Sequence, residues 1–187
     1  MNSLLRTTAA LAASLTLLLP LTADTPGAGY VDLGHFSRSP EGGQFVEVNI
    51  NGSLLAMAVK IAESEEPEVA ELLRGLHAVR VNVLGVNDSN RQELTDRVES
   101  LRSTLSTGGW ERVVTVQEKD QDVGVFLKTD GADAIQGVVL TVLNGKDQAV
   151  FVNIVGNIQP EKIAQVGEHF GIEPLQKLGK AVDKKKK

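Results

Sequence analysis

Three histidines are the side chains of this chain that titrate near neutral pH without any perturbation. His35, His77 and His169 lie far apart in the sequence, and the chain contains no cysteine. A zinc site needs ligands at short spacings, such as a second ligand three or four residues from a histidine. The sequence therefore predicts no metal site, and surface or capping roles for the three imidazoles.

The motifs of nucleophilic and phosphate chemistry are missing from the sequence. No serine stands in the Gly-x-Ser-x-Gly pattern that presents a hydroxyl on a strand-to-helix turn. Gly42-Gly43 and Asn51-Gly52 are not followed by the Lys and Ser or Thr of a phosphate loop, and turn chemistry accounts for both. We therefore expect no enzyme, no catalytic residue and no cofactor.

Acidic residues cluster beside Pro67, at Glu63, Glu65, Glu66 and Glu68. They lack the alternating Asp or Asn and the central Gly of a calcium loop. A solvated helix start is the favoured interpretation, because negative charge there interacts favourably with the helix dipole. The same interpretation applies to three acids at a predicted hairpin tip, Glu118, Asp120 and Asp122. A carboxylate enzyme would need two such acids to converge in a cleft with separated pKa values.

Asn153 interrupts an otherwise apolar strand, and Gly156 follows it closely. A buried amide must be hydrogen-bonded. Two interpretations stay open: the side chain ties the strand end to the loop before Pro160, which we favour, or it contacts a ligand.

The elements that position these residues follow from hydrophobic periodicity and turn residues. Strands are predicted at 45–50, 79–83, 112–117, 123–128, 135–143 and 148–155. Helices are predicted at 54–62, from Pro67 to near Gly75, from Ser89 to Gly108, and from Pro160 to Gly171, with a short terminal helical turn at 175–182. For the third helix, Ser89 is expected to act as the cap, with Gln92 reaching back.

Turn residues separate the last four strands at 119–121, 130–131 and 144–145, which predicts three successive hairpins. The order of elements predicts an α+β two-layer sandwich with a mostly antiparallel sheet, a C-terminal four-strand meander, and helices on one face. If the strand near Leu84, the helix after Ser89 and the strand after Trp110 form a parallel crossover, we expect it to be right-handed.

The first 23 residues predict a cleavable export signal. Arg6 is their only charge, an apolar run spans Ala9 to Leu21, and small residues precede Asp24. This run is too short for a membrane span. Removing the signal removes Arg6 and no acid, which changes the formal net charge from -5 to -6. That balance and the scarcity of aromatic residues argue against nucleic acid as a partner.

The chain is expected to contain one domain. We assign 1–23 to the signal peptide, 24–43 to a flexible linker that docks late, 44–172 to a single α+β domain, and 173–187 to a lysine-rich tail. The four lysines at 184–187 fit a solubilising tail, or a weak peripheral contact with an anionic membrane surface.

A family resemblance rests on the runs at 45–50 and 76–84, the hairpins after Trp110, and the ending at 152–158. Over about Tyr30 to Gly171 the chain resembles a bacterial exported family known as domain of unknown function 4252. The resemblance implies export, often as a lipoprotein, although this chain lacks the lipid-bearing cysteine. It implies no catalytic residue.

We expect a non-catalytic, periplasmic or secreted domain that acts by binding another envelope protein, through an exposed strand edge of its β-rich half. The alternative is a carrier of a small apolar ligand held between sheet and helices. It predicts a closed cavity lined by residues such as Leu101, Val125, Leu127 and Leu140.

Overall fold

The computed structural model describes residues 27–38, 43–131, 134–145, 147–159 and 162. Its helices are α1 (Gly52–Glu65), α2 (Pro67–Arg74) and α3 (Arg91–Thr107). Its strands are β1 (Phe45–Asn51), β2 (Leu76–Gly85), β3 (Glu111–Glu118), β4 (Gln121–Asp130), β5 (Ala134–Asn144) and β6 (Gln148–Ile158). These bounds contain every strand predicted from the sequence and confirm an α+β fold.

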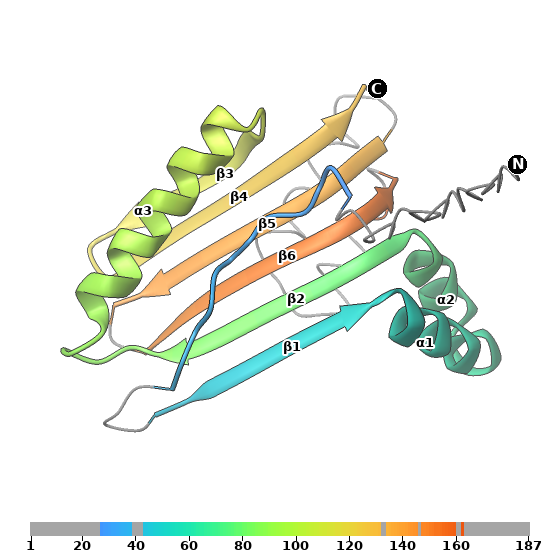
Figure 1. Cartoon of the computed structure of the whole chain (residues 1–187), viewed down its shortest axis with the longest axis horizontal. Helices are drawn as coiled ribbons and strands as arrows, with labels where there is room; N and C mark the ends of the chain where they lie inside the picture. Colours follow the sequence, from blue (N-terminus) through green and yellow to red (C-terminus); the bar gives the residue numbers. More distant parts are fainter. Residues whose placement is uncertain (1–26, 39–42, 132–133, 146, 160–161, 163–187) are drawn as a thin grey trace, which may run out of the picture.

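The strands form one sheet in the order β1-β2-β6-β5-β4-β3, and every neighbouring pair is antiparallel. The last four strands lie side by side in chain order, because polar turns join them as hairpins. Strands β2 and β3 run in the same direction with three strands between them, and α3 connects them across one face (Figure 1).

Both faces of the central strands are buried. On the face that α3 covers, here called the front face, Leu94, Val98, Leu101 and Leu105 of α3 pack with strand residues that include Phe126, Val139 and Phe151. On the opposite face, alternate residues of the same strands form a second cluster that includes Val125, Val138 and Val152. Neighbouring residues of a strand point to opposite faces, so β4, β5 and β6 are apolar on both sides.

The helices do not all share one face, which differs from the prediction. Figure 1 places α1 and α2 at one end of β1 and β2, away from α3. Their buried residues Leu55 and Leu72 belong to the cluster of the opposite face. The reason is the connection: α1 and α2 join two adjacent antiparallel strands, so they stay at the end of that pair, whereas α3 must cross three strands.

The segment 27–38 crosses the front face beside α3 (Figure 1). Val31 and Leu33 are buried there, in the same cluster as the α3 leucines. The Arg97 guanidinium of α3 donates to Leu33 O at 3.1 Å and lies 4.7 Å from the Phe36 ring centre. The described part of the predicted linker at 24–43 is therefore part of the core, because its few apolar residues complete the cover of the sheet.

The expected capping of α3 by Ser89 and Gln92 is wrong. Asn87 organises the turn instead: its Oδ1 accepts from the N–H groups of Ser89 and Asn90 and from the Ser89 hydroxyl. The Gln92 amide donates to Asp96 along the helix. An Asn side chain competes well for nearby backbone N–H groups, so Asn87 takes the role that the sequence pattern assigned two residues later.

Several predicted segments lie outside the described residues: the signal at 1–23, most of the helix from Pro160 to Gly171, the turn at 175–182 and the lysine-rich tail. Within the described ranges, no helix combines the length and apolar character that crossing a membrane requires.

Candidate functional site

The two described histidines stand apart from any cluster of ligands. His35 lies exposed in the segment that crosses the front face, and His77 lies exposed at the start of β2. His169 is outside the described residues. Among the residues that the structure describes, no three His, Asp or Glu side chains gather in a way that would hold a metal ion.

The acids beside Pro67 lie at the α1–α2 junction and are exposed. Glu63 accepts a 2.7 Å hydrogen bond from Arg74, and both side chains are about half exposed. Such a pair stabilises the corner between two helices only weakly, because water screens it. This arrangement is typical of a solvated helix start.

Asp122 and Arg102 form the ion pair that joins α3 to β4. The Arg102 guanidinium binds both carboxylate oxygens of Asp122, one of them at 2.9 Å, and its side chain is only 11% exposed. The hydrogen bond from Arg102 lowers the pKa of Asp122 by more than burial raises it. Gly124 leaves room for this contact, because a Cβ there would lie 3.3 Å from Arg102 Nη2. The pair fixes α3 over the sheet.

Asn153 is fully buried and holds the N-terminal segment on β6. Its Oδ1 accepts from Val31 N–H at 3.0 Å, and its Nδ2 donates to Gly29 O at 3.0 Å and to Val138 O at 3.3 Å. These contacts differ from both interpretations drawn from the sequence, because the partners of the amide are neither in the loop before Pro160 nor a ligand. The side-chain amide of Asn153 supplies residues 29–31 with main-chain hydrogen bonds that a neighbouring strand would otherwise make.

Gly29 permits this close approach. A Cβ at Gly29 would lie 1.8 Å from Gln136 O, far inside contact distance. The segment therefore lies backbone against backbone on β5, and its side chains Val31 and Leu33 fill the space beside α3.

The residues proposed to line one ligand cavity do not meet. Val125, Leu127 and Leu140 belong to the cluster of the opposite face, whereas Leu101 of α3 belongs to the front cluster. The sheet itself separates the two groups. The sequence showed that all four are apolar, but it did not show on which face each one lies.

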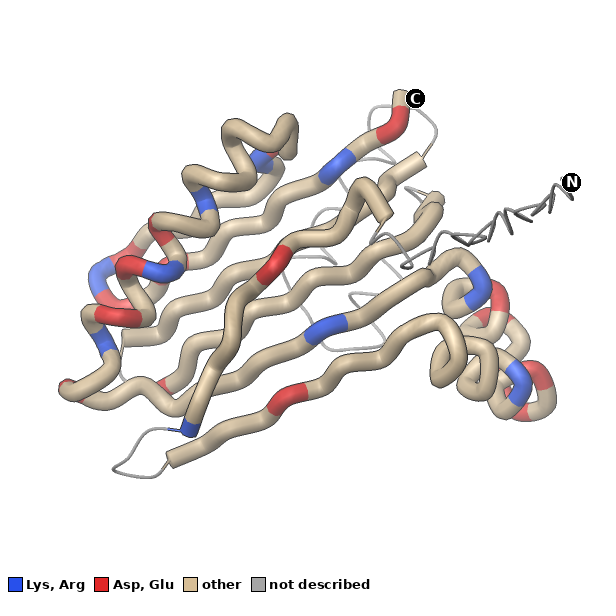
Figure 2. Tube along the Cα trace, viewed as in Figure 1, with Lys and Arg blue, Asp and Glu red and all other residues tan. Residues whose placement is uncertain are grey.

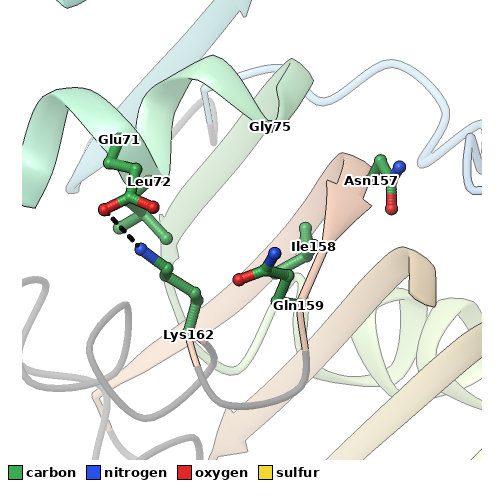
Figure 3. Close-up of a pocket in the computed structure, with 7 residues that line it drawn as sticks. All are labelled: Glu71, Leu72, Gly75, Asn157, Ile158, Gln159 and Lys162. Atoms are coloured by element: carbon green, nitrogen blue, oxygen red, sulfur yellow. Dashed lines mark ion pairs between the residues drawn. The ribbon is translucent and has the colours of Figure 1, made fainter. Parts of the chain in front are cut away.

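Two of the pockets in the described part of the chain are small. The one in Figure 3 has a volume of about 120 Å³, and two of its lining residues, Lys162 and Glu71, form an ion pair at 3.0 Å. A second, of about 200 Å³, lies between His77, Asp130 and Gln136. Pockets for organic ligands usually measure about 300 to 1,000 Å³.

A third pocket falls in that range. This α1–α2 groove has a volume of about 410 Å³. Its lining consists of Gly52, Leu55, Ala56, Val59, Lys60, Glu63, Leu73, Arg74 and Leu76. Its floor is aliphatic, and its charged residues come from the exposed sides of the two helices, so an apolar chain with a polar end would match its surface.

The free edge of β1 lies next to this groove. Strand β1 pairs only with β2 among the described strands, and no shift interrupts their register. It carries one charge, Glu47, and no proline, whereas many of the charged residues lie on the helices (Figure 2). The other edge, β3, has a register shift between Arg112 and Val114 and several charges. Bulges and charges protect edge strands from pairing, so β1 is the less protected edge.

Helix α1 continues directly from β1 and exposes large apolar side chains. Leu54, Met57 and Ile61, here called the α1 row, are 46%, 54% and 59% exposed. Only Leu55 of this helix is buried. The apolar run 54–62 predicts a helix, but this prediction does not separate the buried face of the helix from the exposed one. Because residues 54, 57 and 61 share one helical face, that spacing was the available signal.

The comparison with protein families matches residues 40–166 to the family described as Domain of unknown function (DUF4252). No curated protein and no solved structure matches the chain.

Replacing Asn153 by alanine should loosen the N-terminal segment. Asn153→Ala leaves Val31 N–H and Gly29 C=O without their partner in a buried place, and we expect the free energy of unfolding to fall by about 1–3 kcal/mol. Urea denaturation measures this loss. The control is Asn157→Ala, an exposed asparagine of the same strand, which should change stability by less than about 0.5 kcal/mol. Equal stability of the two variants would contradict the assigned role.

Because of the Arg102–Asp122 pair, the free energy of unfolding should depend on pH in the acid range. The folded-state pKa of Asp122 is lowered, so its contribution is complete above the unfolded pKa and is lost as the pH falls through the folded pKa. We expect Asp122→Asn to cost about 1.5–3 kcal/mol at pH 7, and this difference from the unchanged chain to shrink below about pH 4. Denaturation at several pH values measures it, with the exposed Asp88→Asn as control. A difference that is independent of pH would refute the assignment.

Proposed function

The chain belongs to the DUF4252 family, and from this premise we propose that it is a non-catalytic, exported domain that acts by binding another protein of the cell envelope through the free edge of β1. The observation that carries this proposal is the unprotected edge of a regular strand. An extended segment that pairs with such an edge gains main-chain hydrogen bonds, and side-chain contacts on alternate residues give specificity.

The α1 row extends this binding surface. Leu54, Met57 and Ile61 follow the end of β1 within ten residues and are more than 40% exposed. Exposed apolar side chains that cluster on one element are typical of protein interaction sites. A partner that pairs with β1 would lie next to the start of this row, so both features serve one interface.

The rest of the domain supports this edge. In this proposal the fold is a two-layer α+β sandwich in which the C-terminal meander and α3 form the rigid body that holds β2, and β2 holds β1. The one carboxyl group with a clearly shifted pKa in the described ranges, Asp122, is bound by Arg102. That bond leaves Asp122 a structural role, which agrees with a binding protein.

Export belongs to the proposal as well. The predicted signal at 1–23 would deliver the domain to the periplasm or to the outside, where its partner is expected. The lysine-rich end at 184–187 would add at most a weak electrostatic contact with an anionic membrane. The acidic balance of the chain, with a net charge of -5, does not favour nucleic acid.

A second candidate function is a carrier of an apolar ligand, and the α1–α2 groove favours it. An acyl chain would contact Leu55, Val59 and Leu73 on the floor, and its acidic end would lie near Lys60 or Arg74. In this version the ligand lies at the end of the sheet, and the closed cavity expected between sheet and helices has no part in it.

The edge-binding proposal predicts a position-dependent cross-link. A photoreactive benzophenone amino acid at Asn49 should give an adduct with a protein when intact cells are irradiated, because Asn49 lies exposed in the middle of β1. The matched control is Thr115, which lies exposed in β3 at the protected edge. We expect at least five times more adduct from position 49. Equal yields, or no adduct from position 49, would refute the proposal.

The carrier alternative predicts that filling the groove blocks a lipid probe. A fluorescent fatty acid should bind the purified chain in the micromolar range, and Ala56→Trp should weaken binding at least tenfold, because Ala56 lines the groove. Val113→Trp, on the exposed part of β3, is the control. A probe that does not bind, or binds both variants equally, would exclude this candidate.

A further inference from the structure

We infer that the partner at the β1 edge is a second copy of this chain, whose own β1 pairs antiparallel with the first about a twofold axis at Val48. This inference rests on the proposed function, because it uses the same edge and names its occupant. Four features of β1 carry it: the direction of its main-chain groups, its length, its side-chain pattern and the space at its ends.

The direction of the free main-chain groups follows from one hydrogen bond. Gly85 N–H of β2 donates to Gln44 O at 2.8 Å, and the register of the two strands is regular from there. Hydrogen-bonded and non-hydrogen-bonded pairs alternate along an antiparallel ladder. Residues 44, 46, 48 and 50 therefore bond to β2, and residues 45, 47, 49 and 51 direct their N–H and C=O groups to the open side.

The alternation restricts the register of a symmetric pair. Two residues that lie opposite each other must both direct their main-chain N–H and C=O groups to the open side, or both direct them to their own β2. The two residue numbers of such a pair are therefore both odd or both even, and the twofold axis passes through a residue of the strand. An axis at Val48 pairs 47 with 49 and 45 with 51, all outward, and uses the whole of β1. An axis at Glu47 would shorten the ladder and place two carboxylates opposite each other, which is unfavourable.

The side chains match in the same register. On one face Val46 lies opposite Ile50 of the second copy, and Val48 lies opposite itself, so β-branched aliphatic side chains meet. On the other face Glu47 lies opposite Asn49, whose amide donates to a carboxylate. A surface that is complementary to itself is what a twofold contact requires.

The ends of β1 leave room for the second strand. A Cβ built on Gly43 or on Gly52 would meet no atom within 4 Å. These glycines flank the two ends of β1, so the space beside the backbone at these two positions is open. Val46, at 40% exposure, and the half-buried Val48 would become less exposed in the paired state, because each would contact an aliphatic side chain of the second copy.

The absence of cysteine makes the inference testable with single thiols. Val48→Cys places two thiols at a non-hydrogen-bonded pair, where Cα atoms lie about 4.5 Å apart, within the range that a disulfide spans. Val46→Cys is the matched control, because residue 46 of one copy is offset from residue 46 of the other by four residues, roughly 13 Å. Under mild oxidation of the purified chain, we expect Val48→Cys to form a covalent dimer at least ten times faster than Val46→Cys.

The double variant Val46→Cys/Ile50→Cys should form covalent dimers as Val48→Cys does, because residue 46 of one copy lies opposite residue 50 of the other.

The unchanged chain gives a second measurement. Sedimentation equilibrium should show a dimer, and Asn49→Pro should be a folded monomer, because it removes an N–H that faces the open side and leaves the bonds to β2 intact. A monomeric unchanged chain, or equal rates for Val48→Cys and Val46→Cys, would overturn the inference. If the unchanged chain is monomeric but the probe at Asn49 still captures a different protein in cells, the dimer inference is wrong and the proposed function stands. If the probe at Asn49 captures no protein, the dimer inference and the proposed function are both wrong.

Discussion

The whole structure depends on one constraint: the strands β4, β5 and β6 are apolar on both faces, so both faces must be covered. Val125 and Phe126 are neighbours in β4 that point to opposite sides, and both are fully buried. Val138 and Val139 repeat this arrangement in β5. A strand that alternates apolar and polar residues needs a single layer of cover, whereas these strands need cover on each side. On the front face, α3 and residues 27–38 together provide this cover.

The N-terminal segment shows how a short stretch with few apolar residues can meet that requirement. It forms no helix or strand of its own, and Val31 and Leu33 are its two buried apolar side chains. Asn153 supplies the missing hydrogen bonds from the centre of β6, and Gly29 lets the two backbones approach. A buried amide with satisfied partners adds specificity of position as well as stability. The segment consequently behaves as part of the domain.

The central strands of the sheet are buried on both faces, so the surfaces proposed for binding lie at the edge of the sheet. Strand β1 is the farthest from the buried strands β4 and β5, and it is held by β2 alone. A strand in that position keeps half of its main-chain groups free without cost to the core. The α1 row and the α1–α2 groove lie at the same side of the molecule, and they combine apolar surface with charged residues around it. The proposed interface therefore joins a strand edge to an apolar helix face.

The secondary structure was largely predictable, since period-two patterns and turn residues are local signals. The hairpins around 119–121, 130–131 and 144–145 formed where Asp, Gly and Asn allow tight turns. Local signals also misled: Ser89 fits a capping pattern, yet Asn87 competes for the same N–H groups. The role of Asn153 could not be predicted from the sequence, because its partners Gly29 and Val31 lie more than 120 residues away in the chain.

The class of the fold, the place of each strand and the lack of known catalytic motifs can be read from residues that are close together in the chain. The packed fold is needed to know which apolar residues share a face of the sheet, which strand lies at its edge, and which apolar side chains of α1 are exposed. Leu101 and Val125 look alike in the sequence and lie on opposite sides of the sheet. Leu54 and Leu55 are neighbours, and one is exposed while the other is buried. The packing of helices and strands that lie far apart in the sequence determines which of these side chains is buried.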